Sequence, residues 1–177
     1  CVTEEGLLEG VITIGDITKS YMNLYDSSII SKACTKYANI LDTLEGSMVV
    51  GDSEAYFDRG KVLIAAANPD LMENYIEKYD LVILGNRYES QLCAIEMEAG
   101  CIIVCEGAGV SLTIRKLAQE RGCAVITTPY DTYTAARLIN QSMPISYFMK
   151  TENLITFEET DVIDEIKEVM ASKRHRD

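Results

Sequence analysis

The chain has 177 residues, 47% hydrophobic and 25% charged, a composition typical of one globular domain of ordinary size. No apolar run reaches the roughly 18 residues of a membrane span, so we expect no membrane partner. The formal net charge of −12 argues against nucleic acid as a partner, because an acidic surface repels phosphates. No export signal opens the sequence, and we expect a cytoplasmic protein.

The N-terminal segment predicts a β-like run over residues 10–16 and a helix from Ile17 to Leu24. The pattern Gly10-Val-Ile-Thr13-Ile-Gly-Asp16 places a hydroxyl and a carboxylate three residues apart at the strand-to-helix turn. Such groups suit a phosphate at Thr13 and a ribose diol at Asp16. An ordinary helix cap explains the same pattern.

The middle of the chain alternates short apolar runs with stretches of helical period. The predicted strands are 61–67, 81–84, 101–105 and 123–127. The first of the helices between them starts at Asn68-Pro69, a cap followed by an N1 proline, and runs to Tyr79. Strands buried on both faces that alternate with helices are typical of parallel βαβ units, so residues 47–142 are predicted to form an α/β layered domain.

Three turns follow predicted strands at their carboxyl ends, where such sheets usually hold ligands. They are Gly85-Asn86-Arg87, Glu106-Gly107-Ala108-Gly109 and Pro129-Tyr130-Asp131. The N–H groups of Gly107 and Gly109 could cradle an anion, although a tight turn also needs small residues. Arg87 is either a ligand contact or the partner of a helix carboxylate, and Asp131 is a candidate helix N-cap.

The C-terminal segment predicts a short strand over residues 154–157 and then a helix with one apolar face. That face comprises Val162, Ile163, Ile166, Val169 and Met170. The closing run Lys173-Arg174-His175-Arg176 suits a helix C-terminus, where cations complement the macrodipole, or a phosphate contact.

Metal-dependent hydrolysis needs several His and Asp ligands, whereas His175 is the one histidine here. No P-loop pattern occurs either. The six cysteines lack zinc-site spacing and mostly lie in apolar runs such as Cys101-Ile-Ile-Val-Cys105, which indicates buried free thiols. We therefore expect no catalysis, metal or cofactor in this segment.

The Gly10-x-x-Thr13-x-x-Asp16 pattern resembles the nucleotide-binding end of a CBS (cystathionine-β-synthase type) domain. Residues 149–177 resemble the opening strand and helix of a second CBS domain. Between them, residues 22–148 resemble a DRTGG domain. The Gly-Asp-Arg position of that domain falls on Gly85-Asn86-Arg87, with Asn86 in place of the aspartate. Its Thr-Gly-Gly position falls near residues 106–109. The resemblance implies a layered α/β DRTGG domain flanked by partial CBS (α+β) segments at 1–21 and 149–177.

This order of domains is similar to the regulatory region of bacterial CBS-containing family II manganese-dependent inorganic pyrophosphatases. The resemblance implies that diphosphate is hydrolysed at manganese or magnesium by domains outside this chain. It also implies a homodimer that AMP and ADP inhibit and diadenosine polyphosphates activate. A structural or dimerisation module, and the sensing part of a CBS–DRTGG transcription regulator, are the alternatives.

The same resemblance assigns ligand contacts to individual residues. Thr13, Asp16 and Lys150 would contact the phosphates and ribose of an adenine nucleotide, and Leu154, Ile155 and Thr156 would lie against its adenine. A second site, in the DRTGG domain, would comprise Asn86, Arg87, Gly107, Gly109 and Tyr130.

Overall fold

The computed structural model describes residues 1–22 and 26–173, which divide into two compact units. Unit 1 combines Cys1–Thr13 with Met149–Asp177, so the two chain ends belong to one unit. Unit 2 is the continuous stretch Ile14–Phe148. No helix within the described residues is long and apolar enough to cross a membrane.

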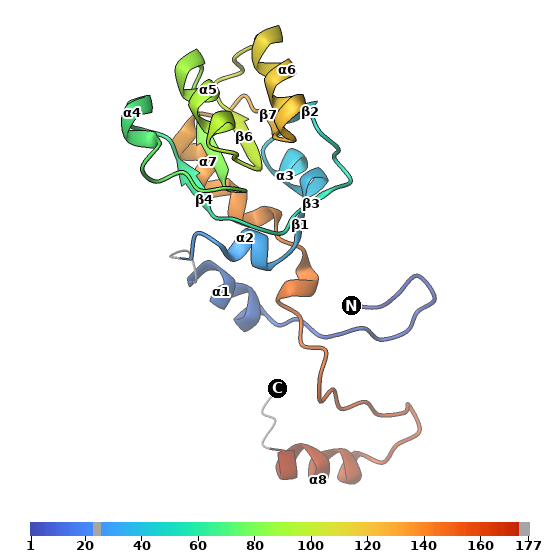
Figure 1. Cartoon of the computed structure of the whole chain (residues 1–177). Helices are drawn as coiled ribbons and strands as arrows, with labels where there is room; N and C mark the ends of the chain where they lie inside the picture. Colours follow the sequence, from blue (N-terminus) through green and yellow to red (C-terminus); the bar gives the residue numbers. More distant parts are fainter. Residues whose placement is uncertain (23–25, 174–177) are drawn as a thin grey trace. The chain divides into compact units, whose positions relative to one another are not determined.

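Unit 2 is built on a five-stranded sheet with the order β2-β7-β6-β5-β4 (Figure 1). The strands are β2 Ser47–Val50, β4 Val62–Ile64, β5 Leu81–Leu84, β6 Cys101–Val104 and β7 Ala124–Thr127. Strands β4, β5, β6 and β7 are parallel, as their alternation with helices predicts. Strand β2 pairs antiparallel with β7 and has a register shift between Met48 and Val50.

Helices cover both faces of this sheet and create two hydrophobic cores. One face is packed by α4 Pro69–Met72, α5 Tyr88–Glu96 and α6 Leu112–Arg121. The other is packed by α2 Ile29–Lys32, α3 Tyr37–Thr43, α7 Thr132–Leu138 and the 3-10 turn η1 Ile139–Ser142. Because successive strand residues point to opposite faces, Ile83 lies in one core and Val82 in the other. Strands β5 and β6, which are buried on both faces, are therefore apolar throughout.

Smaller elements complete the chain. Unit 2 also contains α1 Ile14–Met22, a two-stranded antiparallel sheet of β1 Thr35–Lys36 and β3 Tyr56–Phe57, and the turn η2 Ile145–Tyr147. Unit 1 contains α8 Ile163–Lys173.

The predicted strands at 10–16 and 154–157 are wrong. Val11 forms only an isolated antiparallel bridge with Lys150, residues 154–157 belong to no strand, and α1 already begins at Ile14. A strand requires a continuous ladder of partners, and a short apolar run does not supply one. Leu24, the predicted end of the first helix, lies outside the described residues.

The helix predicted from Pro69 to Tyr79 ends at Met72. After Met72 the N–H groups of Asn74 and Tyr75 donate to carbonyls three residues back. The N–H of Glu77 then donates to the carboxylate of Asp80, at 2.8 Å, and not to a helical carbonyl. Tyr79 then adopts a left-handed backbone conformation with φ of 73°. Local hydrogen bonding to an aspartate thus overrides the helical period of the apolar residues.

The cysteines agree with the expectation from their apolar surroundings. Cys93, Cys101, Cys105 and Cys123 are free and buried, whereas Cys1 and Cys34 are free and exposed. Burial raises the pKa of the Cys123 thiol to about 12, so this thiol stays protonated at neutral pH.

The buried carboxylate of Asp80 joins three segments at the amino edge of the sheet. Its side chain is 1% exposed and accepts hydrogen bonds from the N–H groups of Lys61, at 2.9 Å, and Glu77. Its backbone carbonyl accepts the N–H of Gly100 at 2.9 Å, just before β6. Asp80 therefore holds the entrances to β4, β5 and β6 together.

Replacing Asp80 tests this function. An Asp80→Asn side chain keeps one acceptor oxygen and turns an NH2 group toward the second N–H donor, which leaves a buried donor unpaired. We expect the free energy of unfolding to fall by about 1–3 kcal/mol in urea titrations. The exposed substitution Asp42→Asn on α3 is the matched control and should change it by less than about 0.5 kcal/mol. Equal effects of the two substitutions would contradict this role.

Candidate nucleotide site

The two chain ends meet in unit 1 through a reciprocal pair of backbone hydrogen bonds. The Val11 N–H donates to the Lys150 carbonyl at 3.0 Å, and the Lys150 N–H donates to the Val11 carbonyl at 2.8 Å. Gly10 lies directly against this crossing, where an added Cβ would come within 2.8 Å of the Lys150 oxygen and 3.0 Å of the Met149 sulfur. The close approach of the two segments explains the glycine.

A cavity of about 430 Å³ lies beside this crossing, entirely within unit 1. Four of the residues that the CBS resemblance assigned to a nucleotide line it: Thr13, Lys150, Leu154 and Ile155. They come from segments more than a hundred residues apart in the sequence, and the Val11–Lys150 bridge brings those segments together. The arrangement combines a hydroxyl and an ammonium group with an apolar surface, as ligand pockets do.

Six further residues line this cavity that the sequence did not identify as contacts. They are Val11, Glu152, Asn153, Phe157, Ile166 and Met170. Ile166 and Met170 are four residues apart on α8 and therefore share one face of that helix. The sequence identified this apolar face by its period, but a period alone does not distinguish a pocket wall from an ordinary core.

The other predicted nucleotide contacts are not among the lining residues. Asp16 lies in the first turn of α1, in the stretch assigned to unit 2, and Thr156 is exposed. Their contacts with ribose and adenine remain predictions. The basic cluster Arg174-His175-Arg176 lies outside the described residues.

The predicted DRTGG site lies at the carboxyl edge of the sheet in unit 2. Arg87 is the exposed N-cap residue of α5, and within the described chain it forms no ion pair within 4.0 Å. Gly107 has φ of 63°, and its N–H donates to the Thr128 carbonyl at 2.9 Å. That amide is therefore committed to the fold, which does not support the anion cradle expected of it. The ligand contacts of Asn86 and Gly109 stay predictions.

Tyr130 and Asp131, in the third turn, have local partners. A hydrogen bond to the Glu45 side chain raises the pKa of Tyr130 above its ordinary value. The Asp131 carboxylate accepts the Thr134 N–H at 2.9 Å and thus caps α7, and this bond lowers the pKa of Asp131. The N-cap interpretation of Asp131 is confirmed.

The described residues contain no group of three or more His, Cys, Asp or Glu side chains that could hold a metal ion.

Comparison with known proteins connects this geometry to a family. Residues 39–142 match the DRTGG domain family. Over 168 residues the chain is 36% identical to the cobalt-dependent inorganic pyrophosphatase of Clostridium perfringens, and over 175 residues it is 27% identical to a probable manganese-dependent inorganic pyrophosphatase of Thermotoga maritima. These matches cover 95% and 99% of this chain but 31% and 32% of the relatives, so the chain spans about a third of their length.

The chain is also similar to part of another bacterial protein and to a solved structure of a regulatory region. Over 107 residues, 60% of this chain and 24% of the relative, the chain is 30% identical to the uncharacterized protein YtoI of Bacillus subtilis. A crystal structure of the CBS and DRTGG domains of the regulatory region of C. perfringens pyrophosphatase, complexed with its activator diadenosine tetraphosphate, matches with a TM-score of 0.88 and 35% identity. That match covers 98% of this chain and 76% of the other.

The substitution Gly10→Ala tests how unit 1 is assembled. The added methyl group would push the Lys150 carbonyl away from Val11 and weaken the bridge between the chain ends. We expect the amide protons of Val11 and Lys150 to exchange with solvent about fivefold faster, since one hydrogen bond contributes roughly 1 kcal/mol. Gly109→Ala is the control, because no heavy atom lies within 4 Å of its added Cβ. Unchanged protection in Gly10→Ala would contradict the arrangement.

Proposed function

We propose that this chain, which belongs to the DRTGG domain family, is the nucleotide-sensing regulatory region of a metal-dependent inorganic pyrophosphatase. In this proposal residues 1–21 and 149–177 are parts of two CBS domains, and residues 22–148 are the DRTGG domain between them. Support comes from the agreement in sequence and fold with a CBS–DRTGG regulatory region along nearly the whole chain.

The ligand in this proposal is an adenine nucleotide bound in the cavity of unit 1. The observation that carries it is that Thr13, Lys150, Leu154 and Ile155 line one cavity. Leu154 and Ile155, with Phe157 of the same segment, supply an apolar surface for a flat base. A chain with a net charge of −12 needs a local cation to hold phosphates, and Lys150 supplies it.

Diadenosine polyphosphates would act as activators, and AMP and ADP as inhibitors, of a catalytic site outside this chain. Since a ligand shifts an equilibrium only by binding two states differently, opposite effects require the two kinds of ligand to favour different arrangements of the CBS domains. The full-length protein would be a homodimer. Its catalytic domains would bind manganese, magnesium or cobalt.

The substitution Lys150→Met tests the nucleotide site in the full-length protein. It removes the ammonium group and retains a long apolar stem, so the loss is mainly one of charge. We expect the dissociation constant for diadenosine tetraphosphate, measured by calorimetry, to rise about tenfold, because a charge-assisted contact contributes roughly 1.5 kcal/mol. Basal pyrophosphate hydrolysis, followed as phosphate release, should be unchanged.

Lys116→Met on α6 is the matched control, since Lys116 is exposed in unit 2 and far in sequence from the cavity-lining segments. It should leave nucleotide affinity unchanged. Equal affinities of the two variants for diadenosine tetraphosphate, or a full-length protein that binds none of the three nucleotides at millimolar concentration, would disprove the proposal.

A further inference from the structure

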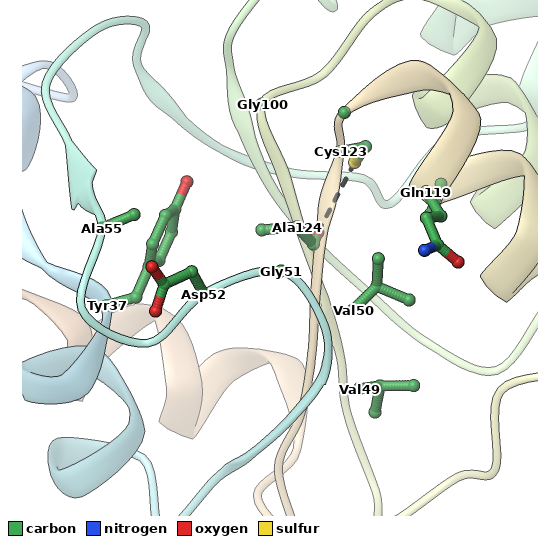
Figure 2. Close-up of a pocket in the computed structure, with 12 residues that line it drawn as sticks. Tyr37, Val49, Val50, Gly51, Asp52, Ala55, Gly100, Gln119, Cys123 and Ala124 are labelled. Carbon is green, nitrogen blue, oxygen red and sulfur yellow. Dashed lines mark hydrogen bonds between the residues drawn. The ribbon is translucent and has the colours of Figure 1, made fainter.

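Unit 2 contains a second cavity, of about 530 Å³, at the opposite edge of the sheet from its predicted ligand site (Figure 2). One wall comes from the end of β2 and the segment that leads toward β3, namely Val49, Val50, Gly51, Asp52 and Ala55. Tyr37 at the start of α3 forms a second, and the turns that enter β6 and β7, at Gly100 and Cys123, form the base. This is the amino edge of the parallel strands.

In the described part of the chain, no basic side chain lines this cavity, whereas Lys150 lines the cavity in unit 1. Of the twelve residues that line it, Asp52 is the only charged one. Oδ1 of Asp52 accepts the Glu54 N–H at 2.9 Å, and within the described chain Asp52 has no ion-pair partner within 4.0 Å. The nearby Lys36 is paired with Glu54 at 2.5 Å. Lys36 also interacts electrostatically with Asp52 but does not line the cavity, so an anionic ligand would meet a carboxylate and no cation among the lining residues that the structure describes.

Tyr37 provides an aromatic surface in the same cavity. Its side chain is buried, and burial raises the pKa of the phenol, so the hydroxyl stays neutral. The face of an aromatic ring attracts ammonium and guanidinium groups, most strongly where water is excluded. Asp52 and Tyr37 thus favour the same kind of ligand group.

The remaining walls suit the body of a small organic molecule. Val49 and Val50 supply an aliphatic surface, and Gln119 at the end of α6 supplies an amide (Figure 2). The Cys123 thiol is not available to react with a ligand, because it is buried and donates to the Ala124 carbonyl at 3.5 Å. The other lining residues are glycines and alanines, which leave the space open.

We propose that this cavity binds a small organic cation, a primary amine or guanidinium group on an apolar body, held by the Asp52 carboxylate and the Tyr37 ring against Val49 and Val50. The site is separate from the nucleotide cavity in residues and in charge preference. The DRTGG domain would then sense a ligand of its own besides holding the CBS segments.

Calorimetric titration of the 177-residue chain with phenethylamine, tyramine and agmatine tests this proposal, with 2-phenylethanol as the neutral analogue. We expect at least one amine to bind and to shift the amide resonances of Gly51, Ala55 and Gln119. We expect 2-phenylethanol to bind about tenfold more weakly than phenethylamine. The absence of binding by all three amines at millimolar concentration would overturn the proposal, and so would equal binding of phenethylamine and its neutral analogue.

Asp52→Asn separates charge from shape, because the asparagine oxygen can still accept the Glu54 N–H. We expect it to weaken amine binding about tenfold, whereas Asp70→Asn, an exposed change in the first turn of α4, should have no effect. Equal affinities of these two variants would overturn the assignment of Asp52. Lys150→Met should not alter amine binding, so this test fails or succeeds independently of the nucleotide proposal.

Discussion

The reciprocal hydrogen bonds between Val11 and Lys150 are the constraint on which unit 1 depends. They join two short segments, neither of which contains a strand of its own, and the closeness of their backbones requires glycine at position 10. Thr13 follows one partner of the bridge and Leu154 follows the other, so the bridge also assembles the cavity. The long stretch from Ile14 to Phe148, which lies between these two segments in the sequence, forms a compact unit of its own.

Charge distinguishes the two cavities. With a net charge of −12, the chain as a whole repels anions, and a phosphate site requires a cation such as Lys150. The cavity in unit 2 has Asp52 as its charged group, so the same acidic background favours cations there. The cavity in unit 1, which Lys150 and Glu152 line, therefore offers a cation to a phosphate group, whereas the cavity in unit 2 offers a carboxylate and, among the described residues, no lining cation.

The sequence predicts the centre of unit 2 well and the chain ends less well. Strands β5 and β6 are apolar throughout because both their faces are buried, and this pattern is readable without any partner. Residues 154–157 show a similar run but have no ladder partner in the structure, so their pattern was misleading. Thr13 is predicted from the pattern of residues 10–16 and from the resemblance, whereas Lys150 is predicted from the resemblance alone. The wall formed by Ile166 and Met170 is not predicted, because apolar periodicity alone cannot distinguish a pocket from a core. The amino-edge cavity had no signal, since glycine, alanine and valine form no motif.

A crystal structure of the full-length protein with diadenosine tetraphosphate tests the central claim most directly. We predict an adenine ring against Leu154 and Ile155 and a phosphate beside Lys150. A nucleotide bound instead at the carboxyl edge of the sheet in unit 2, beside Arg87 and Gly107, with the unit 1 cavity unoccupied, would contradict it.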